Sequence, residues 1–164
     1  MDAMNSPTNL NTKNSFKSLL HQIKLDYSDV TFTSSKSFYW SADSRTVFFD
    51  EHSKDAIWSL LHELGHMTHG HSTYNSDIRL LRMEVEAWDK AREIAQTYNV
   101  VIDEDHIQDC IDSYRSWLHE RSICPRCSQV GAEKSGGDYN CINCGSSWHV
   151  TENRFCRVYR SRTK

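Results

Sequence analysis

The sequence lacks any long apolar run and lacks the start of a secretory leader. No stretch approaches the ~20 consecutive apolar residues that a transmembrane helix needs. The N-terminal residues have neither the basic beginning nor the apolar centre of a signal peptide. These absences predict a cytoplasmic protein that does not insert into a membrane. Residues 1–15 are polar and are predicted to be disordered.

Acidic and basic residues are distributed unevenly along a chain of otherwise ordinary composition. The 164 residues are 38% hydrophobic and 25% charged, with a net charge of −3. Residues 1–120 contain 19 acidic and 11 basic residues, a charge of −8, whereas residues 121–164 contain 3 and 8, a charge of +5. The asymmetry predicts two units with different roles, one over residues 16–121 and a small one over residues 122–164.

The most specific motif of the larger unit is H-E-x-x-H at residues 62–66. Around it, apolar residues recur at helical spacing and predict a helix with one buried face: Ile57, Leu60, Leu61, Leu64 and Met67. Ser53 is a suitable N-cap, and Gly70 stands where a helix ends in a left-handed residue. Gly65 within the motif lowers helix propensity, so a small residue there predicts that another segment or a substrate passes close to the helix.

The spacing of the two histidines indicates metal chemistry. On a helix, His62 and His66 lie one turn apart on the same face, where two imidazoles can bind one zinc ion. Glu63 then stands beside the metal and can act as the general base on a zinc-activated water. A catalytic zinc site needs one further protein ligand and an open fourth position.

The third ligand is not fixed by spacing alone. The extended pattern H-E-x-x-H-x-x-G-x-x-H fails, because His69 replaces its glycine and Ser72 its last histidine. His71 is one residue out of register and is not expected to be a ligand. A second helix is predicted over residues 80–95, with Leu81, Val85, Trp88 and Ala95 on one broad face. It carries two candidate carboxylates, Glu84 and Glu86, and the choice between them stays open.

The motif and this second helix together resemble those of ImmA/IrrE-like metallopeptidases. The likeness rests on the H-E-L-G-H stretch and on Glu84-Val85-Glu86-Ala87 about twenty residues later, and covers roughly residues 16–100. It implies that Glu86, directly before the alanine, is the third zinc ligand, with Glu84 as the alternative. The Phe-Ala that usually follows in that family is replaced here by Asp89-Lys90-Ala91.

Other polar residues near the motif have less defined roles. Asp89 can orient a zinc-binding histidine or form a surface ion pair with Lys90 or Arg92, and the surface pair is the preferred interpretation. His69, His71 and Tyr74 are chemically able to stabilise an oxyanion, but the spacing selects none of them.

The segment before the motif predicts a small α+β fold. Residues 16–24 form an amphipathic pattern with Phe16, Leu19, Leu20 and Ile23 on one side. Short β-like runs follow at residues 30–33, 37–40 and 46–49, and the last two are joined by a turn-rich connection that predicts a hairpin. A helix, a small antiparallel sheet, the motif helix and a glutamate helix form the layout expected of a zincin-like core.

The basic unit contains two C-x-x-C pairs, formed by Cys124 with Cys127 and by Cys141 with Cys144. Four thiolates from two tight turns close a tetrahedral zinc site, which predicts a structural zinc ribbon. Two disulfides are the less favoured alternative in a cytoplasmic chain. Cys110, expected to be buried on a helix over residues 106–120, and Cys156 are given no catalytic role.

The end of the chain alternates basic and aromatic or apolar residues. Arg154, Arg157, Arg160, Arg162 and Lys164 alternate with Phe155, Val158 and Tyr159. Such a pattern is compatible with nucleic-acid binding through the ribbon. A solvated tail is an equally good interpretation.

Three functions remain in competition. The first is a zinc endopeptidase that cuts a protein substrate, which the resemblance implies is a regulatory protein such as a repressor; it contains one catalytic and one structural zinc. The second is a SprT-like protease acting on DNA-bound proteins, although that family uses a later histidine as its third ligand. The third is a non-catalytic adaptor for nucleic acid or protein that retains a vestigial protease core.

Overall fold

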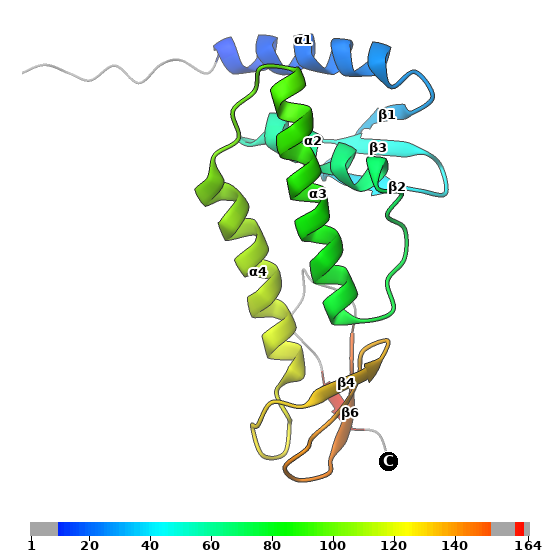
Figure 1. Cartoon of the computed structure of the whole chain (residues 1–164), viewed down its shortest axis with the longest axis vertical. Helices are drawn as coiled ribbons and strands as arrows, with labels where there is room; N and C mark the ends of the chain where they lie inside the picture. Colours follow the sequence, from blue (N-terminus) through cyan, green and yellow to red (C-terminus); the bar gives the residue numbers. More distant parts are fainter. Residues whose placement is uncertain (1–9, 152–159, 163–164) are drawn as a thin grey trace, which may run out of the picture. The chain divides into compact units, whose positions relative to one another are not determined.

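The computed structural model describes residues 10–151 and 160–162 and has an α+β fold (Figure 1). Within these residues it contains four helices, a three-stranded mixed sheet and a C-terminal four-stranded antiparallel sheet. The chain divides into two compact units: residues 1–72 with 87–101, and residues 73–86 with 102–164. The division falls inside one continuous helix. In the described ranges, no helix combines the length and the apolar character needed to cross a membrane.

The first helix, α1, spans Leu10–Asp26 and is longer than the predicted 16–24. Its apolar stripe is confirmed, since all four predicted residues are buried: Phe16, Leu19, Leu20 and Ile23. Phe16 packs on Phe49 of the sheet with ring centroids 5.7 Å apart. Residues 10–15, expected to be disordered, belong to α1, while residues 1–9 lie outside the described part of the chain.

The sheet of the first unit has the strand order β1-β3-β2, with β1 at Thr31–Ser34, β2 at Tyr39–Ser41 and β3 at Thr46–Phe49. The predicted hairpin is confirmed by the antiparallel pairing of β2 with β3. The expectation of a purely antiparallel sheet is wrong, because β1 pairs with β3 in parallel. The most apolar strand, β3, lies at the centre of the sheet, between β1 and β2. Because β3 runs antiparallel to β2 after the hairpin turn, it has the same direction as β1.

The motif helix, α2, spans Ala56–Thr68 and packs on β2 and β3. It begins after Asp55, so the predicted cap at Ser53 is wrong; Ser53 lies in the preceding turn, where its carbonyl accepts from the Ala56 amide at 3.3 Å. The predicted end is confirmed. Gly70 has φ of +63°, and the amide of His71 donates to the carbonyl of His66 at 3.0 Å, as in a Schellman motif.

The glutamate helix, α3, spans Asp77–Thr97 and continues through both units. Its buried face includes Trp88 and Ala95, as predicted, and consists of Asp77, Leu80, Met83, Glu84, Ala87, Trp88, Ala91, Ile94 and Ala95. Leu81 and Val85, which the sequence placed on this face, are only half-buried. The apolar stripe therefore contains two carboxylates.

A close approach of α2 to α3 explains the glycine in the motif. A Cβ atom at Gly65 would lie 2.2 Å from the carbonyl oxygen of Ala87 and 3.0 Å from its Cα. Only glycine lets the two backbones come this near, which confirms that another segment passes close to residue 65. Glycine lowers the helix propensity of α2 at this position. In return, the close contact between the two backbones lets Trp88 of α3 stack on His62 of α2.

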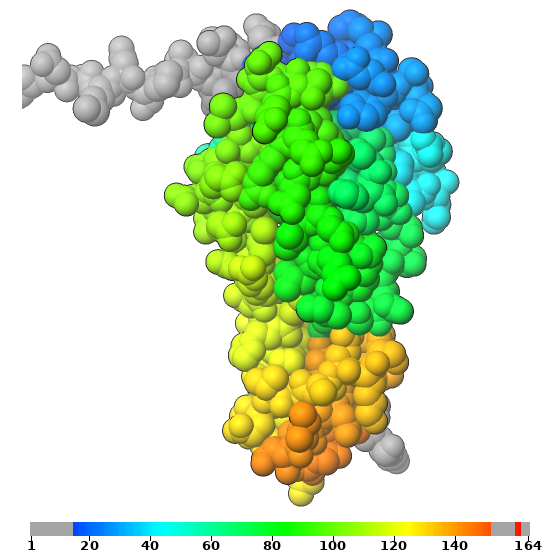
Figure 2. All heavy atoms as spheres, in the orientation of Figure 1, coloured from blue at the N-terminus to red at the C-terminus, as the bar shows by residue number. Residues whose placement is uncertain are grey.

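In the second unit, α4 spans Glu104–Ser122 and is capped by the Asp103 carboxylate, which accepts from the Asp105 amide at 3.0 Å. Strands β4 (Ala132–Ser135), β5 (Asp138–Asn140), β6 (Ser147–Val150) and β7 (Arg160–Arg162) form the antiparallel sheet β4-β5-β6-β7. We call residues 123–151, with the two cysteine turns, the ribbon. Its yellow and orange atoms continue directly from the end of α4 (Figure 2).

Parts of the C-terminal prediction lie beyond the described residues. Arg154, Phe155, Cys156, Arg157, Val158, Tyr159 and Lys164 are among these. The side chain of Arg160 on β7 donates from Nη1 to the carbonyl of Glu120 at 3.0 Å and to that of Ile123 at 3.2 Å. This basic residue therefore binds the C-terminal end of α4. Cys110 on α4 is half-buried, with Sγ 3.7 Å from His106 Nε2.

Substitution of Gly65 by alanine tests the helix contact. The added methyl group meets backbone that can move only if the helices separate, so Gly65→Ala is expected to lower the free energy of unfolding by about 2–3 kcal/mol. Gly70→Ala is the matched control, since a Cβ there meets nothing within 4 Å. Its cost is limited to the strain of positive φ, about 1 kcal/mol. Urea unfolding of both variants measures the difference, and equal losses would contradict the close approach.

Candidate metal centres

His62 and His66, one turn apart on α2, direct their Nε2 atoms toward each other. The Nε2 atoms of His62 and His66 are 3.1 Å apart. Two imidazoles bound to one tetrahedral zinc at 2.0–2.1 Å have nitrogens about 3.3 Å apart. The pair is therefore spaced as zinc ligands are. His62 is buried, with 9% of its surface exposed, and His66 is half-buried.

The Trp88 side chain of α3 contacts one histidine of this pair, His62. Its ring stacks on the His62 imidazole with centroids 4.3 Å apart and an angle of 28° between the planes. The stacking restrains the rotation of the His62 ring. It also places the buried face of α3 beside the histidines, since Glu84 lies one turn before Trp88 on the same face.

Glu84 completes a group of three potential metal ligands. One carboxylate oxygen of Glu84 and one ring nitrogen each of His62 and His66 all lie within 4.8 Å of one another. Glu84 is only 4% exposed. Burial of a carboxylate among apolar neighbours is costly unless a positive charge or hydrogen bonds compensate it. Two imidazoles and a buried carboxylate form a ligand set that fits zinc.

Glu86, which the resemblance favoured, lies elsewhere on α3. It is half-buried, and its carboxylate is 3.5 Å from the guanidinium of Arg79. Residues two apart on a helix point about 200° apart, so only one of the two glutamates can face the histidines. The buried stripe selects Glu84, because that residue is four positions after Leu80 and four before Trp88. The structure thus places the alternative residue, rather than the preferred one, with the histidines.

Glu63 is one of three buried carboxylates among the described side chains, together with Asp77 and Glu84. It is 8% exposed and follows His62 on α2, but it does not belong to the three-residue ligand group. A carboxylate that is next to a metal without binding it is available for proton transfer. The role of Glu63 as general base stays a prediction.

His71 contacts the other nitrogen of His66. The two Nδ1 atoms are 2.9 Å apart, so one ring donates and the other accepts. His71 is buried, and its backbone carbonyl accepts from the Trp40 indole at 3.0 Å. A ligand histidine commonly uses its second nitrogen to hydrogen-bond a neighbour that fixes the ring. The motif register assigned His71 no ligand role, and its contact in the structure is with His66, a candidate ligand.

The four ribbon cysteines form a second cluster. The sulfur atoms of Cys124 and Cys144 are 3.7 Å apart, and those of Cys127 and Cys141 are 3.5 Å apart. Four sulfurs at 2.3 Å from a tetrahedral zinc are about 3.8 Å from each other. None of the five described cysteines forms a disulfide. The spacing fits a metal, and all four ligand atoms lie within 4.8 Å of one another.

The two cysteine turns have the same backbone structure. In each, the first cysteine donates its amide to the carbonyl five residues later at 2.8 Å, and its carbonyl accepts from the amide four residues later at 3.0 Å. That fourth residue has positive φ in both turns, +60° at Ser128 and +72° at Gly145. Hydrogen bonding to Ser146 lowers the pKa of the Cys144 thiol to about 6, which favours the thiolate that binds zinc.

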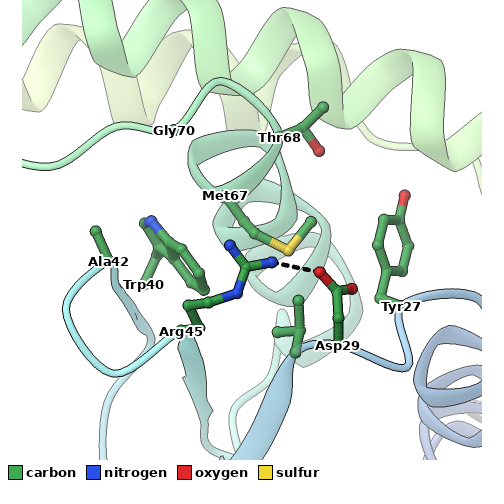
Figure 3. Close-up of a pocket in the computed structure, with 9 residues that line it drawn as sticks. Tyr27, Asp29, Trp40, Ala42, Arg45, Met67, Thr68 and Gly70 are labelled. Atoms are coloured by element: carbon green, nitrogen blue, oxygen red, sulfur yellow. Dashed lines mark hydrogen bonds and ion pairs between the residues drawn. The ribbon is translucent and has the colours of Figure 1, made fainter.

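An open pocket of about 330 Å³ lies at the C-terminal end of α2 (Figure 3). Its wall combines apolar and charged side chains, and an ion pair joins Arg45 to Asp29. The lining residues are Tyr27, Asp29, Val30, Trp40, Ala42, Arg45, Met67, Thr68 and Gly70. Trp40 contributes to the pocket and also donates to His71. The pocket therefore borders the residues that surround His66.

The remaining candidates near the motif lie at the surface or keep an undefined role. Asp89 pairs with Arg92 at 2.6 Å and is 64% exposed, as the surface interpretation expects. His69 stacks on His71 with ring centroids 5.3 Å apart. The assignment of an oxyanion-stabilising residue among His69, His71 and Tyr74 stays a prediction.

Comparison with models of known protein families, with curated proteins and with solved structures gives no match. What the chain shows is a His-His-Glu group on helices, consistent with a zinc site, and a cluster of four cysteines in a ribbon-like sheet.

Paired substitutions of the two glutamates test the ligand assignment. Glu84→Gln is expected to weaken zinc binding at the histidines about 100-fold or more, since changes beyond the direct ligands already cost 10–100-fold. Glu86→Gln, the matched control on the opposite face, is expected to leave it unchanged. Competition with a chromophoric chelator gives both affinities. A reversed order of effects would assign the ligand to Glu86.

Proposed function

We propose that the chain is a zinc-dependent endopeptidase whose catalytic metal is held by His62, His66 and Glu84. The observation that carries the proposal is the convergence of two imidazole nitrogens 3.1 Å apart with a buried carboxylate, next to a second buried carboxylate at Glu63. Three ligands leave one tetrahedral position open, as in catalytic rather than structural zinc sites.

The chemistry divides between the metal and Glu63. A zinc ion held by His62, His66 and Glu84 would polarise the peptide carbonyl and would lower the pKa of a water molecule towards ~7. Glu63 accepts the proton of the attacking water as its oxygen bonds to the carbonyl carbon. Glu63 then returns the proton to the amine nitrogen as the C–N bond breaks. A single carboxylate therefore serves first as general base and then as general acid.

The ribbon takes a second zinc with a different role. Four thiolates fill all four tetrahedral positions, so no site remains for substrate, and the metal is structural. Cys124 and Cys141 are each 1% exposed, which shields half of the ligand set from solvent. The proposed protein thus contains one catalytic and one structural zinc ion.

The alternatives are less well supported. A SprT-like protease uses a third histidine, whereas a glutamate accompanies the two histidines here. A non-catalytic adaptor does not require a carboxylate buried beside two histidines. Contact between the basic C-terminus and nucleic acid remains a proposal that is compatible with the peptidase. The resemblance to ImmA/IrrE-like proteins supports a regulatory protein, such as a repressor, as the substrate.

Glu63→Gln tests the activity directly. The variant is expected to retain two zinc ions per chain but to lose cleavage by 10²–10⁴-fold, the contribution typical of general acid–base catalysis. The range of substrates is expected to be narrow. The measurement is therefore the set of new protein N-termini in cells that express the wild-type chain or the variant. Identical sets of N-termini together with two bound zinc ions would sink the peptidase and leave a metal-binding adaptor.

His71→Ala tests the contact that holds His66. Loss of the Nδ1 partner is expected to weaken zinc binding at the histidines about tenfold, while an unchanged circular dichroism spectrum shows that the fold persists. His71→Asn, which can keep a hydrogen-bonding atom near the same place, should restore part of the affinity. His69→Ala is the matched control, because His69 stacks on His71 without an Nδ1 contact to His66. An equal effect at both positions would refute a specific role for His71.

A further inference from the structure

The first residue of α3 is held by the ribbon and by the end of α4. The Asp77 carboxylate accepts a hydrogen bond from the Tyr139 hydroxyl on β5 and lies 3.1 Å from the Arg121 guanidinium on α4. The Asp77 amide donates to the Glu133 carboxylate on β4 at 2.7 Å. Asp77 and Arg121 are both buried, at 8% and 1% exposure. All four residues belong to one compact unit.

The Glu133 carboxylate connects the start of α3 with the β4–β5 turn. While one oxygen accepts from the Asp77 amide at the N-terminus of α3, the other accepts from the Gly137 amide at 3.3 Å in the β4–β5 turn. In the same turn, the Gly136 amide donates to the carbonyl of Asn75, just before α3, at 3.1 Å. A carboxylate at a helix N-terminus satisfies free amides and the helix dipole. The ribbon hairpin therefore satisfies the first amide of α3, next to the Ser76 hydroxyl, which accepts from the Arg79 amide at 3.3 Å.

The same hairpin belongs to the core around the cysteines. Tyr139 stacks on Trp148 with ring centroids 5.4 Å apart, and both are buried together with Cys124, Cys141 and Val150. The Trp148 indole donates to the carbonyl of Arg121 at 3.0 Å. So small a ribbon buries too little apolar surface to be stable alone, and units below roughly 40 residues usually need a metal or disulfides. A metal bound by the four cysteines would therefore hold Tyr139 and Glu133 in place.

Glu84 is two helical turns beyond Asp77 on the same face. Seven residues turn a helix through about 700°, only 20° short of two full turns, and advance it by about 10 Å. A helix is stiff because of its backbone hydrogen bonds. A shift of Asp77 at its first residue is therefore transmitted along the axis to Glu84. The residues from 73 to 86, which include Glu84, are assigned to the same compact unit as the ribbon.

We propose that the ribbon is part of the scaffold of the His62–His66–Glu84 group: with its own metal bound, it holds Asp77 through Tyr139 and Glu133 and thereby positions Glu84. The inference rests on the ligand assignment of the proposed function. We call Glu133, Tyr139 and Asp77 positioning residues, since none of them belongs to the His62–His66–Glu84 group. Loss of metal from the four cysteines, or oxidation of their thiols, then lowers the affinity of the histidine site without any change at the histidines.

Tyr139→Phe in the full-length chain tests the coupling. It removes the hydroxyl that binds Asp77 but keeps the ring that stacks on Trp148, so the cysteine site should keep its metal. The expected result is an approximately tenfold weaker affinity for zinc at the histidine site, measured by chelator competition. Glu133→Gln should act in the same direction. Asp138→Asn is the matched control, because Asp138 is the neighbour of Tyr139 on β5 and pairs with the exposed His149 at 2.8 Å.

A double-mutant cycle separates positioning from general destabilisation. If Tyr139 acts through Glu84, Tyr139→Phe has no further effect on zinc affinity in a Glu84→Gln chain. Cobalt substitution provides an independent readout: Tyr139→Phe should alter the d–d absorption of cobalt at the histidine site and leave the thiolate-to-cobalt band of the ribbon unchanged.

These measurements distinguish a failure of the coupling from a failure of the ligand assignment. A wild-type chain that binds two zinc ions, with unchanged affinity and cobalt spectrum in Tyr139→Phe, overturns the coupling alone. Full effects of Tyr139→Phe in the Glu84→Gln chain also overturn it, because Glu84 would not be the target. A wild-type chain that binds only one zinc, at the cysteines, overturns the ligand assignment and the coupling with it.

Discussion

The backbone contact between Gly65 and Ala87 is the constraint on which the candidate site depends. A Cβ at residue 65 would lie 2.2 Å from the carbonyl oxygen of Ala87, so α2 and α3 can approach this closely only at a glycine. The approach lets Trp88 stack on His62, and Trp88 is one turn from Glu84. Any separation of these helices would move the carboxylate away from the imidazoles, because each ligand is rigidly placed on its own helix.

A second constraint acts at the beginning of α3. Asp77 is buried, and burial raises the pKa of its carboxyl group although Tyr139 and Arg121 oppose the shift. A buried acid of this kind is a cost to the fold unless its partners stay in place. Those partners come from the ribbon and from α4. The ribbon is thus more than an appendage to the core: the helix that carries Glu84 begins on it.

The sequence was informative where local pattern and local chemistry agree. The motif at residues 62–66 and the paired cysteines have fixed spacings, and the structure brings each set together because a helix turn and two tight turns determine their geometry. The amphipathic pattern of α1 and the hairpin of β2 and β3 are likewise local. The left-handed end of α2 at Gly70 follows from the same kind of signal.

The sequence was less informative where a tertiary contact decides. Leu81 and Val85 suggested one face of α3, but Ala87 and Ala91 line the face that approaches other segments, because small residues permit close packing. The buried stripe runs through Asp77, Leu80, Glu84, Ala87 and Ala91. The position of Glu84 on this stripe was the one sequence feature that could have identified it as the buried glutamate. The parallel pairing of β1 and the partners of Asp77 depend on residues far apart in the chain, for which no spacing rule exists.

The two histidines and Glu84 matter to function only if a metal joins them. The most direct measurement is anomalous X-ray scattering at the zinc edge from crystals of the full-length chain. The account predicts two zinc peaks, one among the four cysteine sulfurs and one bound by His62 Nε2, His66 Nε2 and the Glu84 carboxylate. A single peak at the cysteines, or a second one bound by Glu86, would contradict it.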